Sequence, residues 1–273
     1  ARGGMTSHAA VVARGMGKCC VSGAGAINVD YKARTVEIDG IVLKEGDFIS
    51  INGTTGEVYN GKVETKAAEV SGDFADLMAL CEKHTKLVVR TNADTPHDAK
   101  VARDFGAVGI GLCRTEHMFF EAEKIVAMRE MILSPDAEGR KAALAKLLPY
   151  QKADFYGIFK AMDGCPVNVR LLDPPLHEFV PHDAKGQEEM AAAMGVSVQT
   201  IKQRVESLCE ANPMLGHRGC RLGNTYPEIT EMQTRAILGA AIQLKKEGGD
   251  PHPEIMVPLT GILYEFEAQE KVI

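Results

Sequence analysis

From about residue 73 onward, short β-prone segments alternate with helix-like segments, and this alternation limits the fold more than any other feature of the chain. Runs rich in apolar and β-branched residues predict strands at 86–91, 108–113, 167–172, 214–219 and 254–259. Helical patterns are predicted between them at 96–105, 121–133, 139–162, 196–211 and 228–246. Strands that alternate with helices form parallel sheets, and the favoured α/β architecture is a barrel. Because eight strands close such a barrel, five predict an incomplete (β/α)8 TIM-type barrel.

The chain before about residue 60 has a different texture. A short helix is predicted over 5–17, where hydroxyl residues can cap its start and glycines can end it. Residues 19–59 contain short β-prone runs separated by glycine turns such as Asp39-Gly40. A polar stretch without periodicity follows, and we interpret residues 63–75 as a linker. The predicted domains are therefore 1–62 and 76–273.

Composition excludes several classes of protein. Lys and Arg number 31 against 37 Asp and Glu, so the net charge of −6 argues against a nucleic-acid binder. Only 5% of residues are aromatic and Trp is absent, which also disfavours a base-stacking platform. No apolar run is long enough for a transmembrane helix, so we expect no membrane partner.

Cysteine usage indicates the compartment. The seven cysteines include no Cys-x-x-Cys pair, which favours a reducing, cytoplasmic location over a disulfide framework. The sequence begins at Ala1 rather than Met and ends within a helical pattern, so organellar targeting of the parent protein stays open.

The first chemical signal is a histidine at the predicted start of the first helix. His8 follows two glycines, Met5 and the hydroxyl residues Thr6 and Ser7. Free backbone N–H groups and the positive end of the helix dipole favour an anion there and disfavour a cationic imidazole. A neutral imidazole is what a phosphoryl acceptor needs, and Thr6, Ser7 and Arg14 could surround the transferred group. The alternative is a histidine with a structural role only.

The second signal is a set of arginines at the ends of predicted strands. Arg114, Arg170 and Arg218 each lie at or just after such an end. Active sites of α/β barrels lie at the carboxyl ends of their strands, so these side chains should converge. Their guanidinium groups suit a small carboxylate or phosphate substrate. The alternative is that each arginine forms a structural ion pair with a nearby carboxylate; the candidates are Asp94, Glu116, Asp173 and Glu178.

Five stretches, four of which contain these residues, resemble the phosphoenolpyruvate-utilising enzymes. Residues 3–14 resemble the phosphohistidine motif of that family. Residues 15–21, 111–120, 170–179 and 212–221 are most similar to its pyruvate, phosphate dikinase branch. The resemblance runs from end to end. It implies a partial swivelling β/β/α phosphohistidine domain followed by the N-terminal part of the phosphoenolpyruvate/pyruvate-binding barrel.

The resemblance also implies a reaction. Enzymes of this branch are phosphotransferases with paired acceptors that convert ATP, phosphate and pyruvate reversibly into AMP, diphosphate and phosphoenolpyruvate through a phosphohistidine. By motif, His8 would be the carrier, and Arg114, Arg170 and Arg218 would hold pyruvate or phosphoenolpyruvate. Thr6 matches a position of regulatory phosphorylation in plant members.

Part of the family pattern is missing from this sequence. The nucleotide-binding domain, through which ATP and phosphate would act, is absent. The Mg²⁺ ligands and the general acid cysteine are expected beyond the last residue, so no metal ligand is expected within the chain. We therefore expect this stretch alone to be inactive and the intact enzyme to be a homo-oligomer.

Other functions remain open at this point. The sister phosphoenolpyruvate synthase and enzyme I types share the histidine motif. A non-catalytic barrel that binds a phosphorylated metabolite is the alternative from another class.

Overall fold

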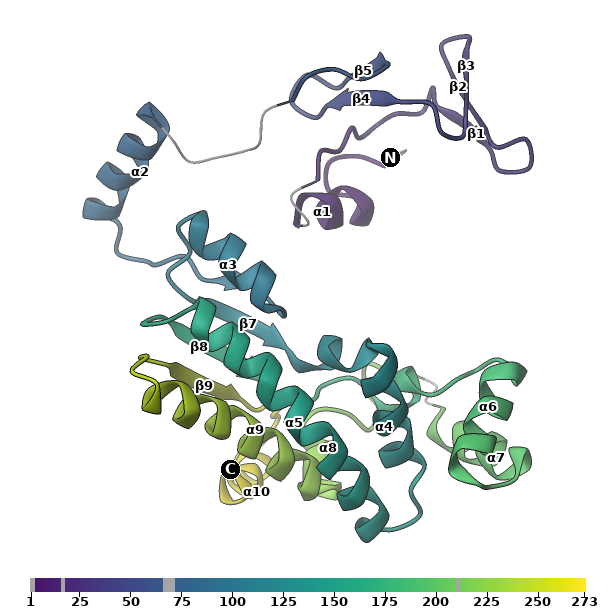
Figure 1. Ribbon diagram of the computed structural model, residues 1–273, viewed down its shortest axis with the longest axis vertical. Coiled ribbons are helices and arrows are strands. Elements are labelled where there is room, and N and C mark those ends of the chain that lie inside the picture. The colour runs from purple at the N-terminus through teal and green to yellow at the C-terminus, as the bar shows by residue number, and fades with distance from the viewer. Residues whose placement is uncertain (1–2, 16–17, 66–71, 210–211) are drawn as a thin grey trace. The chain divides into compact units, whose positions relative to one another are not determined.

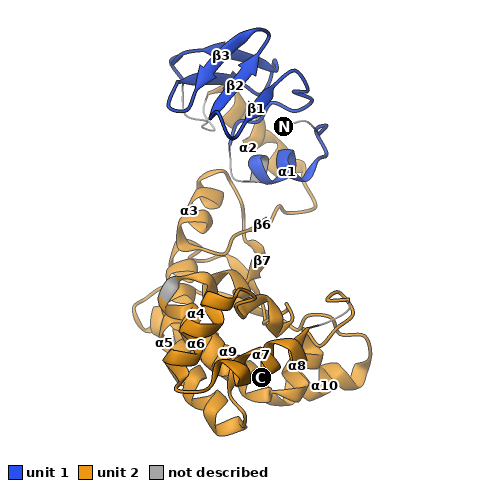
Figure 2. Ribbon diagram, turned by 90° about the vertical axis from the view of Figure 1, so that its right-hand side faces the viewer, with its two compact units in different colours: residues 1–69 blue, residues 70–273 orange. Residues whose placement is uncertain are grey.

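The computed structural model describes residues 3–15, 18–65, 72–209 and 212–273. The fold is mixed α/β, and the chain divides into two compact units, Ala1–Glu69 and Val70–Ile273 (Figure 2). Across these described ranges, no helix combines the length and the apolar character needed to span a membrane.

The first unit contains one helix and two small antiparallel sheets. Its helix is α1 (His8–Gly15). Strands β1 (Asn28–Asp30), β2 (Thr35–Ile38) and β3 (Ile41–Lys44) form one sheet, and β4 (Ile49–Asn52) pairs with β5 (Glu57–Asn60) in the other. Asp39 and Gly40 join β2 to β3 with φ values of 48° and 80°. Positive φ at both positions matches the twist of a tight hairpin, which confirms the turn predicted from this pair.

The second unit is built on a four-stranded parallel sheet. Its strands β6 (Thr91–Asn92), β7 (Ile110–Arg114), β8 (Pro166–Arg170) and β9 (His252–Met256) lie side by side in sequence order. The α-helices of this unit are α2 (Asp73–His84), α3 (Pro96–Asp104), α4 (Ala122–Leu133), α5 (Ala137–Ala161), α6 (Ala184–Met194), α7 (Val198–Leu208), α8 (Cys220–Thr225), α9 (Pro227–Lys246) and α10 (Leu263–Val272). Two 3₁₀ segments, η1 (Thr115–Phe120) and η2 (Leu176–Phe179), follow β7 and β8.

One face of this sheet is covered and the other carries polar groups. Along β8, Val167 and Val169 are buried, whereas Asn168 and Arg170 are only half-buried. The buried valines pack with Phe155 of α5 and Ile237 of α9 in one apolar cluster. Figure 1 shows α5 and α9 side by side along the sheet. Strand alternation thus assigns alternate side chains to the core and leaves Arg170 on the opposite face.

The predicted helices at 96–105, 121–133, 139–162 and 228–246 are confirmed as α3, α4, α5 and α9. Side-chain caps explain where α3 and α5 begin. The Thr95 side chain accepts a hydrogen bond from the Asp98 N–H, and the Asp136 side chain accepts one from the Gly139 N–H. The last two residues of the predicted helix 196–211 and of the predicted helix 5–17 lie outside the described residues.

Two of the five predicted strands are wrong in whole or in part. Residues 214–219 form turns rather than a strand, because Asn212 accepts the Met214 amide through its side chain and Gly219 has a φ of 59°. Met214 and Leu215 are 72% and 75% exposed, so their apolar character does not mark a core segment. The predicted strand 86–91 shortens to β6 (Thr91–Asn92), and its Leu87, Val88 and Val89 are exposed.

Three helices of the second unit have no counterpart among the predicted elements. Helices α2, α6 and α8 were not predicted, and α2 begins at Asp73, inside the segment interpreted as a linker. Residues 66–71 of that segment lie outside the described residues.

Candidate functional site

His8 is the first residue of α1 and is exposed. Ser7 caps this helix: its Oγ accepts the Ala10 amide at 3.4 Å, and its own N–H donates to the carbonyl of Gly4 at 3.0 Å. Gly3 permits this tight approach, because a Cβ there would lie 2.7 Å from the Ser7 Cβ. The local sequence therefore presents the imidazole at a helix N-terminus, where amide N–H groups favour an anion.

The other residues predicted around His8 are only partly placed. Thr6 is exposed and Ser7 is half-buried, directly before the histidine. The side chain of Arg14 lies outside what the structure describes. A nearby hollow of about 380 Å³ is lined by Met5, Ala10, Lys18 and residues 53–56, among others, and His8 is not part of its lining. The exposed imidazole is accessible to a separate donor or acceptor.

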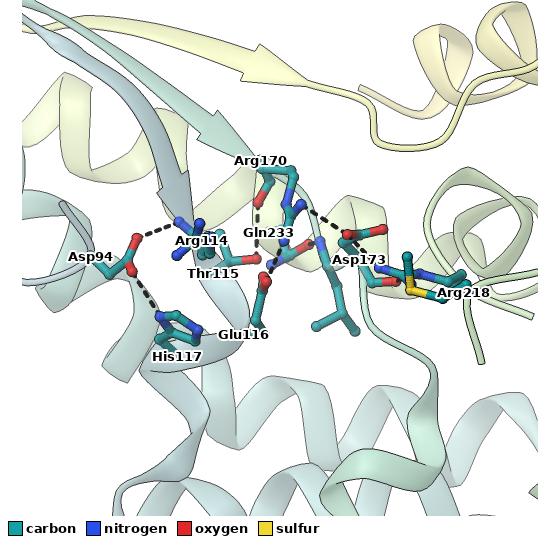
Figure 3. A network of polar contacts seen from close by, with 11 residues as sticks. Asp94, Arg114, Thr115, Glu116, His117, Arg170, Asp173, Arg218 and Gln233 are labelled. Atoms are coloured by element: carbon teal, nitrogen blue, oxygen red, sulfur yellow. Dashed lines mark hydrogen bonds and ion pairs between the residues drawn. The ribbon is translucent and has the colours of Figure 1, made fainter. Parts of the chain in front are cut away.

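The predicted arginines of the second unit gather at the carboxyl ends of two neighbouring strands. Arg114 ends β7 and Arg170 ends β8, and the two residues are paired across the parallel ladder. Arg218 lies immediately before Gly219, the residue that caps α8. Figure 3 shows all three within one network of polar contacts.

Asp173 joins two of these arginines through a single oxygen. Its Oδ2 accepts from Arg170 Nη1 at 2.9 Å and from Arg218 Nη2 at 2.7 Å. Arg170 also pairs with Glu116 through Nη2, and Arg218 Nε donates to the Asp173 carbonyl at 3.3 Å. Asp173 and Glu116 are buried, so water screens these pairs little. The carboxylates hold the two guanidinium planes in fixed orientations.

Arg114 differs from the other two arginines. Its backbone N–H donates to Asp94 Oδ1 at 2.6 Å, and Asp94 Oδ2 lies 2.7 Å from His117 Nδ1. Its guanidinium group makes no hydrogen bond or ion pair with any residue in the described ranges. No residue in these ranges therefore competes with an anion for its five N–H donors.

The site also concentrates buried polar atoms that lack a partner. Eight side-chain nitrogen and oxygen atoms of the described residues are buried without a hydrogen bond, and four of them belong to this network. They are Glu116 Oε2, Arg170 Nε, Asp173 Oδ1 and Gln233 Nε2. Buried polar groups are nearly always paired, so a cluster of exceptions marks a place where a ligand or ordered water completes the structure.

The sequence left two interpretations of the arginines, a substrate site or structural ion pairs, and the structure has features of both. Arg170 and Arg218 form the ion pairs of the structural alternative, with Glu116 and Asp173, while Arg114 forms none with the residues that the structure describes. Glu178, the fourth candidate partner, is exposed. Thr115 and Gln233 were missed entirely, because no local motif or spacing links them to Arg170.

The carboxylates of this network do not form a metal site by themselves. In the parts of the chain that the structure describes, no three His, Cys, Asp or Glu residues are grouped as ligands of one ion. Glu116 and Asp173 are instead paired with arginine.

Cys113 precedes Arg114 but is fully buried, and burial raises the pKa of its thiol. Burial likewise raises the pKa of the Cys220 thiol. Because the thiolate is the reactive form and each unit by which the pKa rises lowers its population about tenfold, we expect both thiols to resist thiol-specific reagents. Exposed Cys81 and Cys209 should react with Ellman's reagent at pH 8 in the native protein. Cys113 and Cys220 should react only after denaturation, and native labelling of Cys113 would contradict this burial.

Comparison with known proteins shows the family of this chain. Residues 68–273 match the family model described as PEP-utilising enzyme, PEP-binding domain, and residues 1–56 match the model described as PEP-utilising enzyme, mobile domain. The chain belongs to the PEP-utilising enzymes.

Individual relatives are similar over the whole chain. A "Pyruvate, phosphate dikinase" of Giardia intestinalis is 59% identical over 273 residues, all of this chain and 31% of the relative. A protein of the same name from Clostridium symbiosum is 55% identical with the same coverage. "Pyruvate, phosphate dikinase 2" of Zea mays is 54% identical over 275 residues, again all of this chain and 31% of the relative. The chain thus spans about a third of the length of these relatives.

Proposed function

We propose that this chain contains the phosphoryl-carrier histidine and part of the substrate-binding site of an enzyme of the pyruvate, phosphate dikinase type. In this proposal the whole protein interconverts ATP, phosphate and pyruvate with AMP, diphosphate and phosphoenolpyruvate. The observation that carries it is the cluster of Arg114 and Arg170, at the carboxyl ends of parallel strands, with Arg218 from the turn before α8, in a chain that also presents His8 at a helix start. The 54–59% identity to enzymes of that name supports it.

His8 is the proposed phosphoryl carrier. An imidazole nitrogen attacks the β-phosphorus of ATP, and an N–P bond forms as the O–P bond to AMP breaks. Inorganic phosphate then attacks the terminal phosphorus of this diphosphoryl group, the P–O–P bond breaks, and diphosphate leaves a phosphohistidine. In the second half reaction pyruvate loses a methyl proton to a base, the enolate oxygen attacks the phosphohistidine, and the new O–P bond forms as the N–P bond breaks. Ser7 shapes the first turn of α1, whose N–H groups favour the transferred anion. Thr6 and Arg14 complete the proposed surroundings, and Thr6 is a proposed position of regulatory phosphorylation.

The arginines are proposed to bind phosphoenolpyruvate or pyruvate. Arg114, whose guanidinium group has no partner among the described residues, can donate to a carboxylate or a phosphoryl group, and the guanidinium groups of Arg170 and Arg218 are oriented by Asp173. Charge develops on the enolate oxygen and on the phosphoryl oxygens as the bond changes. Donors held in place before the reaction stabilise that charge without reorganising.

The same proposal includes the domain boundaries and the fold of each domain. Residues 1–62 would be the C-terminal part of a swivelling β/β/α phosphohistidine domain, 63–75 a linker, and 76–273 the N-terminal part of a TIM-type barrel. The parallel order β6-β7-β8-β9 supports a barrel segment, since barrel strands follow one another in sequence order.

The remaining partners lie outside this chain in the proposal. ATP and phosphate would act through a separate nucleotide-binding domain, and Mg²⁺ would be held by other segments. Bound Mg²⁺ would neutralise phosphoryl and enolate charge. The intact enzyme would be a homo-oligomer. Its proposed cytoplasmic location is supported by the seven free cysteines, which suit a reducing compartment.

The decisive experiment measures ATP formation from phosphoenolpyruvate by the whole protein that contains this chain. We expect formation that requires both AMP and diphosphate. Phosphate in place of diphosphate would indicate the phosphoenolpyruvate synthase type. Transfer only to a carrier protein would indicate the enzyme I type. Binding of phosphoenolpyruvate without turnover would indicate a non-catalytic barrel.

A further inference from the structure

The backbone leaves its hydrogen-bonded ladder just after β8. The Leu171 amide donates to the Met256 carbonyl at 3.0 Å, which continues the pairing with β9. On either side of this bond, the Arg170 carbonyl accepts from a side chain and the Leu172 amide donates to one. Leu172 is buried, so an unpaired amide there would be costly.

Two buried side chains from distant elements supply these bonds. Thr115, which follows β7, donates from Oγ1 to the Arg170 carbonyl at 3.0 Å across 55 positions in sequence. Gln233 of α9 accepts the Leu172 amide through Oε1 at 2.8 Å across 61 positions. Both residues are 0% exposed. Together they clamp the backbone between Arg170 and Asp173, and Figure 3 shows them within the arginine network.

Packing does not account for a glutamine at this position. Gln233 lies on the buried face of α9 with Thr230, Ala236 and Ile237, where a methionine of similar length would fill the space. Its Nε2 is buried without a partner in the described part of the chain, which costs stability. In exchange, the glutamine Oε1 provides the hydrogen-bond acceptor that orients the Leu172 N–H.

The clamp acts on the residue that organises the site. Leu172 directly precedes Asp173, whose Oδ2 holds both Arg170 and Arg218. A shift of this backbone would move Asp173 and reorient both guanidinium groups together. Misplacement by about 1 Å can cost roughly 100-fold in rate, because donors must match the charge that develops in the transition state.

We propose that Gln233 and Thr115 are positioning residues for the arginine site, which act through the backbone of residues 170–173 without touching the substrate. This inference rests on the proposed function, because it assigns the two residues a part in turnover of phosphoenolpyruvate.

The test compares Gln233→Met with Gln151→Met in the whole protein. Gln151 of α5 is a matched control, since it is 1% exposed and neither its Oε1 nor its Nε2 has a partner in the described ranges. Gln233→Met should lower kcat for AMP- and diphosphate-dependent ATP formation by roughly 10- to 100-fold. Its KM for phosphoenolpyruvate should change much less, because Arg114, which Asp173 does not hold, still binds the anion. Gln151→Met should keep the wild-type kcat.

Three further measurements separate positioning from general destabilisation. Hydrogen exchange at the Leu172 amide should accelerate in Gln233→Met and not in Gln151→Met. Gln233→Glu, which keeps an acceptor oxygen, should recover part of kcat. Thr115→Val should lower kcat, whereas Thr115→Ser, which keeps the hydroxyl, should retain it. The threonine pair decides the question if Gln233→Met does not fold.

The outcomes distinguish the two proposals. If wild-type protein forms ATP and both Gln233→Met and Thr115→Val match Gln151→Met in kcat, the positioning role is wrong and the proposed function stands. If wild-type protein shows no turnover of phosphoenolpyruvate, the proposed function fails and this inference fails with it.

Discussion

Replacement of His8 by Asn should abolish covalent phosphorylation of the whole protein by phosphoenolpyruvate and by ATP alike. The substitution removes the nucleophilic imidazole, and both half reactions of the proposed function pass through it. His8 is exposed at the start of α1, and Ser7 caps this helix, so the fold should persist. The measurement is transfer of acid-labile ³²P from each labelled donor.

His84→Asn is the matched control for this result. His84 is likewise an exposed histidine in a helix, at the last position of α2, and we assign it no chemistry. That variant should be labelled like the wild-type protein. Labelling of the His8 variant by either donor would show that another residue carries the phosphoryl group.

Replacement of Arg170 by Lys should lower turnover with pyruvate or phosphoenolpyruvate by roughly 10²- to 10³-fold, the usual cost of losing one preorganised donor to a developing anion. Arg170 uses Nη1 for Asp173 and Nη2 for Glu116. A single ammonium group cannot reproduce that fork, so it cannot keep both bonds, and Asp173 would then be held chiefly by Arg218. The ATP half reaction, followed as phosphorylation of His8, should continue at its normal rate.

Arg235→Lys serves as the control for the change of side chain. Arg235 forms an exposed ion pair with Glu231 on α9, and such pairs contribute little. Both half reactions should therefore be unaffected in this variant. If Arg170→Lys slowed only the ATP half reaction, the assignment of Arg170 to the pyruvate side would be wrong.

Local sequence patterns were sufficient for the elements with strong periodicity or clear boundary signals. Helices α3 and α5 each begin at a side-chain cap, and the Asp39-Gly40 turn was readable from its two residues. The same reasoning failed at 214–219, where apolar residues lie in an exposed turn. Hydropathy alone cannot tell a buried strand from a loop whose apolar side chains face solvent.

The sequence by itself determined the alternation of strands and helices, the histidine with its hydroxyl neighbours, and the three arginines at predicted strand ends. These features depend on residues that are neighbours in the chain. Only the tertiary structure decided that Asp173 bridges Arg170 and Arg218, that Arg114 stays unpaired in the described residues, and that Thr115 and Gln233 hold the backbone of β8 at its end. Those contacts join residues up to 61 positions apart. They exist because the parallel strand order and the packing of α9 bring their backbones together, which no local pattern encodes.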